Sequence, residues 1–542
     1  MNKNFQILLV IPRYRYTTEP DYIYPFPIGL AYILAVLKKE GYNVDCLNLN
    51  HYRGSIEELM EQNLRKKQYD FVCTGSNALG YSIVKIIINS TREYSKARFI
   101  LGGPIITTEP EFIYQDLKPD FGVLGEGEET IVELLKFLEK NKNLKKVKGI
   151  IFDNGGEIVI TGKRESIKNL DSIPYPDFEG LEFEEQLGKA HCNDYFYENI
   201  FDYPRTYAIL ASRSCPFNCT FCYHDSIYRQ RSLGNIMQEL RGAVKKYRIN
   251  LILMYDECFS INKERLKEFC KEIEKLRGEI SWDLKVAAQL TVHNMDREIL
   301  SLMKNAGVDT ISYGFESFSP TVLRSMGKPI TPEQINRAFH ETLKAGIGIQ
   351  ANFIFGDIAE TKETAKETLD WWKKNCQGQV GLGFIQPYPG SKIYKHCLEK
   401  GIIKNKLDFI KNKISMGHWF NMTDKMTDEE IKQLRSEILD SMGKYTKFVR
   451  PISIKKMKKS VYEFAVKCPF CGKVVSYKNC FVKDRFTYGF NLICRNCHMR
   501  FFVVSAIQKL AYKYYPKIRA LRDYQKKAIE YFGKKKIKIR KS

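Results

Sequence analysis

The chain has 542 residues, a length typical of about three domains. Its 86 lysines and arginines outnumber its 63 acidic residues, which gives a net charge of +23, and a hydrophobic content of 44% excludes wholesale disorder. No apolar run is long enough to cross a membrane, and the short apolar stretch near the N-terminus is expected to be a buried strand, not a signal peptide. We therefore expect a cytoplasmic protein whose 15 cysteines are thiols or metal ligands.

Residues 1–150 are expected to form a Rossmann-like domain around a doubly wound parallel sheet. Apolar strands alternate with helical patterns, and three of the strands end in a loop that contains glycine. Ligands bind such sheets at the carboxyl ends of the strands, which is where these loops lie. A polar segment with several prolines, residues 151–203, is expected to connect this domain to the next one.

Six further apolar strands, separated by helical patterns, predict a partial parallel β/α barrel over residues 204–400. The active residues of such barrels lie at the C-terminal ends of the strands. Beyond the barrel we expect a helical extension at 401–459, a four-cysteine module at 460–503 and a basic amphipathic tail at 504–542. The fold class is therefore α/β, with two α/β domains followed by a small metal ribbon and a basic helical tail.

Cys215, Cys219 and Cys222 follow the first barrel strand in a C-x3-C-x2-C spacing. Three thiolates on one loop can bind three irons of a [4Fe-4S] cluster and leave the fourth iron open for another ligand. A zinc site is the alternative, but zinc sites usually contain paired C-x2-C motifs or histidines at wider spacing, and His224 lies at no such spacing. The motif therefore predicts a catalytic iron–sulfur cluster.

This motif, with Phe221 before its last cysteine and a β/α barrel after it, resembles the radical SAM superfamily. The resemblance implies that the open iron binds S-adenosylmethionine (SAM), which is cleaved to give a 5′-deoxyadenosyl radical. It also implies SAM contacts at the ends of the second, fourth and fifth barrel strands. These contacts are Asp256 and Glu257, Glu316 and Ser317, and Gly356, Asp357 and Glu360. Gln289 on the third strand departs from the arginine that relatives often carry.

The first domain and the connector resemble the B12-binding domain that precedes many radical SAM barrels. The resemblance implies that cobalamin lies along the strand ends, where small residues allow close approach. These positions are Thr74, Gly75, Ser76, Gly102, Gly103, Gly125 and Glu126, the last two in a turn that extends to Glu128. The loop after the first strand has no histidine, so cobalamin would pack against Arg13–Tyr16 without histidine ligation. Alternatively, the glycines serve only the fold.

Two C-x2-C pairs near the C-terminus predict a single metal site with four thiolate ligands, Cys468, Cys471, Cys494 and Cys497. Zinc with a structural role is the expected occupant, and a mononuclear iron that transfers electrons is the alternative. His498 is expected to take no part in binding the metal, because four thiolates already complete a tetrahedral site.

Residues 505–542 contain 13 basic and two acidic residues and therefore carry a net charge of +11. A basic amphipathic helix of this kind can lie on an anionic membrane surface, which would place the protein at the inner face of the membrane. Binding to RNA and a solvated cap with a disordered end are the two alternatives.

The resemblances imply an enzyme that methylates an unactivated carbon of a hydrophobic, lipid or membrane-associated substrate, with cobalamin as cofactor and ferredoxin or flavodoxin as reductant. One alternative is radical cyclisation or C–C bond formation on a lipid or pigment without methyl transfer. Another is RNA modification, in which the four-cysteine module and the tail would bind nucleic acid. Against this third hypothesis, the sequence shows no known RNA-binding module and no clear stacking platform in the tail.

Overall fold

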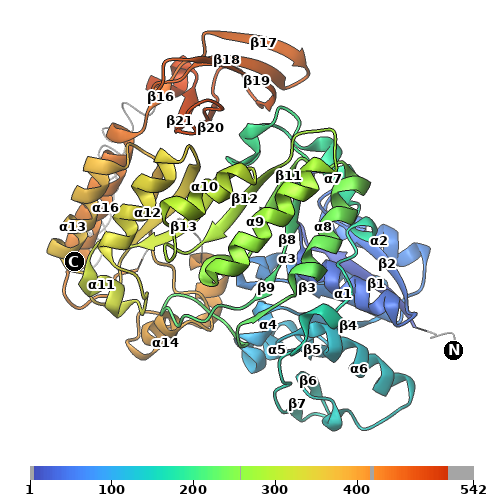
Figure 1. Ribbon diagram of the computed structural model, residues 1–542. Coiled ribbons are helices and arrows are strands. Elements are labelled where there is room, and N and C mark those ends of the chain that lie inside the picture. The colour runs from blue at the N-terminus through green and yellow to red at the C-terminus, as the bar shows by residue number, and fades with distance from the viewer. Residues whose placement is uncertain (1–4, 257, 415–419, 511–542) are drawn as a thin grey trace, which may run out of the picture.

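A computed structural model describes residues 5–256, 258–414 and 420–510 (Figure 1). Its N-terminal sheet has seven strands in the order β2-β1-β3-β4-β5-β6-β7, with β1 to β5 parallel and β6 and β7 antiparallel. The strands are β1 (Gln6–Ile11), β2 (Asn43–Asn48), β3 (Phe71–Gly75), β4 (Arg98–Gly102), β5 (Phe121–Val123), β6 (Ile150–Asp153) and β7 (Ile158–Ile160). The sheet thus continues beyond residue 150, where the sequence placed the end of the first domain.

Helices cover both faces of this sheet, so its central strands are apolar along their length. Leu8 and Val10 of β1 pack on one side, whereas Ile7, Leu9 and Ile11 pack on the other. The helices are α1 (Ile28–Lys39), α2 (Ile56–Lys66), α3 (Tyr81–Tyr94), α4 (Pro104–Thr107), α5 (Pro110–Leu117) and α6 (Gly127–Glu139). This arrangement confirms the doubly wound α/β domain.

The second sheet has six parallel strands in the order β15-β14-β13-β12-β11-β8 and forms a partial barrel. Its strands are β8 (Thr206–Ile209), β11 (Leu251–Met254), β12 (Lys285–Leu290), β13 (Val308–Glu316), β14 (Gly348–Phe355) and β15 (Val380–Phe384). The helices between them are α8 (Leu233–Tyr247), α9 (Lys263–Gly278), α10 (Arg297–Asn305), α11 (Pro320–Ser325), α12 (Pro332–Lys344) and α13 (Lys362–Asn375). All six expected strands are present.

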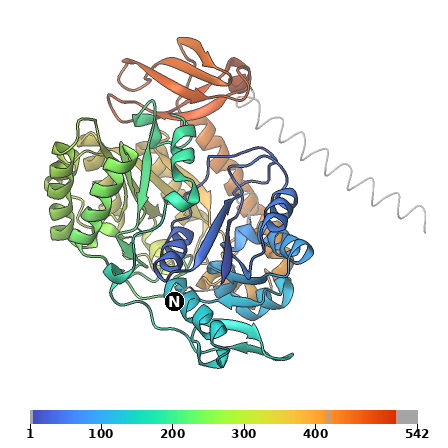
Figure 2. The ribbon, with the colours of Figure 1, turned by 90° about the vertical axis from the view of Figure 1, so that its right-hand side faces the viewer.

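Between the two domains, the connector forms one short helix, α7 (Phe183–Lys189), and three 3-10 turns, η3 (Leu170–Ser172), η4 (Glu179–Leu181) and η5 (Glu198–Ile200). After the barrel come α14 (Lys392–Glu399), α15 (Lys406–Asp408), a π-helical turn at Phe409–Lys413 and α16 (Asp428–Tyr445). Figure 2 shows the first domain (blue) beside the barrel (green to yellow), with a C-terminal ribbon (orange to red) across one end of the barrel.

The ribbon consists of two three-stranded sheets, β16-β21-β20 and β17-β18-β19. Its strands are β16 (Phe448–Val449), β17 (Ser453–Lys458), β18 (Val461–Lys467), β19 (Val474–Phe481), β20 (Gly489–Ile493) and β21 (Arg500–Val504). Two of these strands precede residue 460, so the helical expectation for 401–459 is wrong in its last part. The segment is lysine-rich and exposed, and it therefore lacks the apolar alternation that marks a strand.

Most of the predicted basic tail, residues 511–542, lies outside the described residues. Within the described part of the chain, no helix combines the length and the apolar character that a membrane span requires.

Candidate functional site

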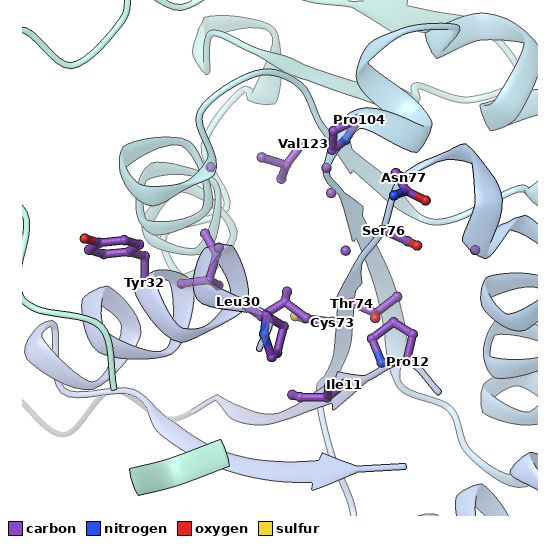
Figure 3. A pocket seen from close by; sticks show the side chains of 18 of the residues that line it. Ile11, Pro12, Leu30, Tyr32, Cys73, Thr74, Ser76, Asn77, Pro104 and Val123 are labelled. Carbon is purple, nitrogen blue, oxygen red and sulfur yellow. The ribbon is translucent and has the colours of Figure 1, made fainter. Parts of the chain in front are cut away.

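A cavity of about 790 Å³ lies between the carboxyl edge of the first sheet and the start of the barrel. Figure 3 shows side chains around it from the end of β1 (Ile11, Pro12), from α1 (Leu30) and from the end of β3 (Thr74, Ser76). The barrel contributes residues that follow the ends of β8 and β11. These are Leu210, Ser212, Arg213, Ser214 and Tyr255. The cavity is therefore shared by the two domains, and its volume falls within the range of ligand pockets.

All seven positions that the sequence assigned to cobalamin line this cavity: Thr74, Gly75, Ser76, Gly102, Gly103, Gly125 and Glu126. Gly103 has a φ of +86°, and a Cβ atom there would lie 2.7 Å from the carbonyl oxygen of Ser76. Gly125 also has a positive φ, of +74°. Thr74 donates its hydroxyl proton to the carbonyl of Val10 at 2.8 Å, which fixes β3 against β1. Gly103 therefore lets the loops after β3 and β4 pack closely against each other in the cavity wall, with no side chain of its own.

The loop after β1 approaches the cavity differently from what the sequence suggested. Arg13 lines the cavity, but its guanidinium donates to backbone carbonyls, among them Leu49 and Tyr52 at 2.9 Å each, and so it holds the loop. Tyr14 lines the cavity and is exposed, whereas Tyr16 is exposed outside the lining. No histidine is among the described residues that line the cavity.

Glu126 joins the first domain to the barrel. Its carboxylate accepts a bidentate pair of hydrogen bonds from Arg229 of β10 (Arg229–Gln230), at 2.6 and 3.0 Å. Arg213 of β9 (Ser212–Arg213) donates to Glu126 at 3.3 Å and also pairs with Glu128. Burial alone would raise the pKa of Glu126, but the bonds from Arg229 and from the backbone N–H of Ile167 hold that pKa below its ordinary value. Its carboxylate is therefore charged and serves as a bridge between the domains.

The three cysteines of the C-x3-C-x2-C motif lie on the loop that follows β9. Cys219 is buried, Cys215 is half-buried and Cys222 is exposed. Ser214, just before the motif, has a φ of +64°, a conformation that costs energy for any residue other than glycine. Within the described residues these thiols do not form a tight ligand group of the kind found in the C-terminal ribbon. Wider spacing suits thiolates that bind different irons of one cluster.

The cysteine loop is held by the segment after α11 and by the start of α14. The backbone N–H of Thr220 donates to the carbonyl of Met326 at 2.8 Å, and the N–H of Ile393 donates to the carbonyl of Thr220 at 3.0 Å. A Cβ atom on Gly327, whose φ is +64°, would lie 3.1 Å from the carbonyl oxygen of Asn218. Glycine at this position therefore permits the two segments to pack closely.

Lys328 was not predicted from the sequence as a site residue. Its ammonium lies 3.2 Å from the carboxylate of Glu316, and both side chains are largely buried. Burial alone would lower the pKa of Lys328, but the charges of Glu316, Cys219 and Cys222 hold that pKa above its ordinary value. The only sequence signal for Lys328 is its position two residues after Met326 (M-x-K). That position becomes informative only when the structure shows how the loops lie.

Asp256 lies at the end of β11, fully buried. Its carboxylate accepts hydrogen bonds from the Ser212 hydroxyl at 2.5 Å and from the Ala211 N–H at 3.1 Å. Burial raises the pKa of Asp256 to about 6 in spite of these bonds. Asp256 therefore fixes the strand end that leads into the cysteine loop. Glu257 lies outside the described residues.

The two residues predicted at the end of β13 point to different partners. Glu316 has a φ of +60° and pairs with Lys328, as described above. The Ser317 hydroxyl is buried, lies 3.1 Å from the hydroxyl of Thr368 and accepts the N–H of Ser319. Of the two, Glu316 is the one that lies beside the cysteine motif.

Gly356, Asp357 and Glu360 follow β14. Glu360 is buried and accepts hydrogen bonds from the Thr364 hydroxyl at 2.8 Å and from the Gly356 N–H at 3.2 Å, while burial raises its pKa to about 7. Asp357 is fully buried. Its Oδ1 accepts the N–H of Ala359, whereas its Oδ2 has no hydrogen-bond partner among the described residues. Asp357 is therefore the residue of this group that retains an acceptor for a ligand.

The C-terminal ribbon contains a second, separate site. The Sγ atoms of Cys468 and Cys497 are 3.6 Å apart, those of Cys471 and Cys494 are 3.7 Å apart, and all four lie within 4.8 Å of one another. Four thiolates at about 2.3 Å from one tetrahedral ion are about 3.8 Å apart, whereas a disulfide would bring two sulfurs to about 2 Å. The geometry therefore suits one metal ion.

The ribbon packs against the N-terminal ends of the barrel strands. His498 Nδ1 lies 3.3 Å from the carboxylate of Asp309 in β13. The Arg500 N–H donates to the Gln379 side chain at 2.7 Å, and its guanidinium donates to the carbonyl of Gly378, just before β15. His498 is thus a docking residue. The four-cysteine site lies at the opposite edge of the barrel from the cysteine loop, which follows the carboxyl end of β8.

The match to known families agrees with this geometry. Residues 209–371 match the model of the radical SAM superfamily, and residues 22–135 match that of the B12-binding domain. The chain thus combines a B12-binding domain with a radical SAM domain. The superfamily match supports SAM and a [4Fe-4S] cluster as cofactors, and the B12-binding match supports cobalamin.

Three similar proteins illustrate the relationship. An uncharacterized methyltransferase of Pyrococcus horikoshii is 28% identical over 421 residues, which cover 74% of this chain and 85% of the relative. An anaerobic magnesium-protoporphyrin IX monomethyl ester cyclase of Cereibacter sphaeroides is 29% identical over 397 residues, which cover 69% of this chain and 60% of the relative. The fold resembles that of the radical SAM methyltransferase TsrM of Kitasatospora setae, solved with cobalamin and a [4Fe-4S] cluster (17% identity, TM-score 0.58, covering 73% of this chain and 76% of TsrM).

Proposed function

We propose that this radical SAM enzyme is a cobalamin-dependent methyltransferase that acts on an unactivated carbon of a hydrophobic substrate. The cavity between the domains carries the proposal, because its glycine-rich wall leaves backbone bare where a flat macrocycle would lie. When bound, the cluster and SAM supply a 5′-deoxyadenosyl radical, and cobalamin supplies methyl transfer. A low-potential donor such as ferredoxin or flavodoxin would deliver the electron.

The residues of this chain have definite tasks in the proposal. Gly103 and its neighbours admit the macrocycle, and the cavity offers no imidazole to cobalt from the described lining. Cys215, Cys219 and Cys222 hold the cluster, and Glu316 and Asp357 offer acceptors to SAM from neighbouring strands. Most residues that line the cavity are apolar, and the exposed rings of Tyr14 and Tyr255 add to the lining from the two domains. This lining favours a hydrophobic substrate.

A second candidate is radical cyclisation or C–C bond formation without methyl transfer. The similarity to a cyclase favours it, because the cyclase is 29% identical to this chain and the methyltransferase is 28% identical. RNA modification has no comparable support in the cavity.

We also propose that Cys468, Cys471, Cys494 and Cys497 bind a structural zinc ion. The sulfur–sulfur distances support a tetrahedral site. A role in electron transfer is disfavoured by its position, because strands of up to nine residues, roughly 30 Å, separate the two edges of the barrel.

Anaerobic reconstitution tests the main proposal. With hydroxocobalamin, the purified protein should retain about one corrinoid per chain with a spectrum lacking histidine ligation. With SAM and dithionite it should release 5′-deoxyadenosine, and with SAM labelled in its methyl group the label should appear on the corrinoid fraction. A variant with Cys215, Cys219 and Cys222 all replaced by Ala should lose the absorbance at roughly 400 nm and the SAM cleavage, whereas Cys46→Ala, outside the motif, should lose neither. Complete loss of corrinoid on gel filtration would favour cyclisation or coupling instead.

A further inference from the structure

The net charge of the protein is concentrated at its C-terminal end. Residues 1–449 contain 61 basic and 59 acidic residues, so the two catalytic domains together carry only +2. Residues 450–542 contain 25 basic and four acidic residues and carry +21. Within this region, residues 450–504, which form most of the ribbon, contribute 12 basic and two acidic residues. The charge is therefore a property of the ribbon as well as of the tail.

The most exposed part of the ribbon is its edge strand β17 with its flanking residues, here called the β17 edge (Ile452–Lys459). All six residues of β17 are exposed, and among the strands of the described residues β17 pairs with β18 alone. Ile452, Ile454 and Met457 are 61%, 43% and 45% exposed, so three large apolar side chains are exposed within six positions of one edge. Four lysines lie among them: Lys455, Lys456, Lys458 and Lys459. Aliphatic and cationic side chains are thus exposed together along one open edge.

The same pattern recurs elsewhere in the ribbon. Val474 is 59% exposed beside Lys473, and Phe486 is 55% exposed beside Arg485. The two acidic residues of the ribbon are occupied locally. Glu463 accepts a hydrogen bond from Ser476, and Asp484 accepts the backbone N–H of Phe486. Neither forms an ion pair with the lysines of the β17 edge within the described residues, so that positive charge is available to a partner.

We propose that the β17 edge docks on an anionic lipid surface, with its lysines among the headgroups and Ile452, Ile454 and Met457 in the interfacial layer. Charge complementarity selects an anionic partner, and exposed aliphatic side chains gain free energy from a lipid interface but not from a nucleic acid backbone. Nucleic acid sites favour arginine forks and stacking aromatic rings. Here lysines predominate, and Arg495 and Arg500 are already used within the fold.

The position of the ribbon is compatible with this role. It covers the N-terminal ends of the barrel strands, whereas the cavity and the cysteine loop lie at the carboxyl ends. Docking through the β17 edge would leave the cavity uncovered. Docking through this edge does not depend on which reaction the enzyme catalyses.

Vesicle flotation with the full chain tests the proposal. Wild type should float with vesicles of phosphatidylcholine containing 30 mol% phosphatidylglycerol, should not float with pure phosphatidylcholine, and should lose binding as salt rises.

Because each lysine near an anionic surface is worth about fivefold in partitioning, K455Q/K456Q should weaken binding roughly ten- to thirtyfold. I452N/I454N should weaken it several-fold at high salt as well as at low salt. Matched controls on the catalytic domains, K400Q/K404Q and I158N/I160N, should change binding less than twofold.

Three results would overturn the proposal. One is equal flotation of the wild type and both β17 variants, which would place any lipid binding elsewhere. Another is tighter binding of a 20-nucleotide oligouridine or of tRNA than of the vesicles at the same salt, which would assign the surface to nucleic acid. The third is no binding to any of these probes. Metal content and SAM cleavage should stay at wild-type levels in every variant. If K455Q/K456Q loses its metal, K458Q/K459Q tests the same edge in its place.

Discussion

The ammonium of Lys328 lies 3.2 Å from the carboxylate of Glu316, and this pair is buried against the cysteine motif. Three thiolates and their cluster would present negative charge to the same ammonium. With a cluster bound, Lys328 would balance two anionic groups, the Glu316 carboxylate and the cluster on the cysteine loop. The pair would then lie between the end of β13, where we expect SAM, and the cluster.

Removal of this cation should make the cluster harder to reduce. A buried positive charge stabilises the more negative, reduced state, so Lys328→Met should lower the midpoint potential by on the order of 100 mV, the effect of a unit charge at an effective dielectric constant of about 20. Lys328→Arg keeps the positive charge, so its midpoint potential should stay close to that of the wild type. An EPR-monitored redox titration at constant iron content measures both. An unchanged potential in Lys328→Met would show that the ammonium does not act on the cluster.

Gly103→Ala should weaken cobalamin binding at least tenfold. The new Cβ would lie 2.7 Å from the Ser76 carbonyl oxygen, so the cavity wall must move. Gly156→Ala is the matched control, because Gly156 also has a positive φ, of +96°, but a Cβ atom there would have no neighbouring atom within 4 Å among the described residues. Both variants should lose about 1 kcal/mol of stability from the backbone conformation, and only Gly103→Ala should lose the corrinoid. Equilibrium dialysis with hydroxocobalamin distinguishes them, and equal affinities would place the cofactor away from this wall.

Removal of metal from the ribbon should destabilise the contacts between the ribbon and the N-terminal ends of the barrel strands. His498 and Arg500 contact Asp309 and Gln379, and a metal bound by the four neighbouring cysteines would fix the segment that carries them. One equivalent of zinc per chain is expected, and a strong chelator should increase amide hydrogen exchange across 448–504 and at the start of β15, but not in the first sheet. Cys494→Ser should reproduce the effect. Unchanged exchange in metal-free protein would show that the ribbon folds without its ion.

Glu198 should make stability depend on pH. Burial, and then the nearby charge of Asp194, raise its pKa to about 8, against an ordinary value of 4.5. Between these two pH values the folded protein holds a proton that the unfolded chain has released, so stability falls as pH rises through this window. Glu198→Gln keeps an acceptor for the Thr206 hydroxyl and should be more stable than wild type at pH 8 by on the order of 3 kcal/mol, with little difference near pH 4.5.

Urea unfolding at pH 5, 6.5 and 8 measures this difference, and Glu165→Gln, at an exposed carboxylate, is the control that should follow wild type. Parallel pH profiles for wild type and Glu198→Gln would contradict the assignment.

The strands and the cysteine motif could be predicted because each depends on local spacing along the chain. The glycines of the cavity wall could also be predicted, because each follows an apolar strand in the sequence and the strand ends of a parallel sheet lie at the same edge. Glu126 shows the limit of this reasoning. Its partner Arg229 lies 103 positions away in the sequence and reaches Glu126 only because the two domains dock. No periodic pattern in the sequence therefore predicts the pair. β17 was missed for a different reason, because an exposed edge strand has no buried face to impose alternation.

The bridge from Arg213 and Arg229 to Glu126 and Glu128 has a consequence for the inheritance of these domains. Arg213 lies two residues before Cys215 and Arg229 lies in β10, whereas Glu126 and Glu128 lie at the start of α6, where they line the cavity. A B12-binding domain transplanted from another enzyme would leave two buried guanidinium groups without counterions unless it carried carboxylates at both positions. The two domains are therefore constrained to be exchanged as a matched set, and chimeric enzymes should recover corrinoid and cluster together only when this interface is transferred intact.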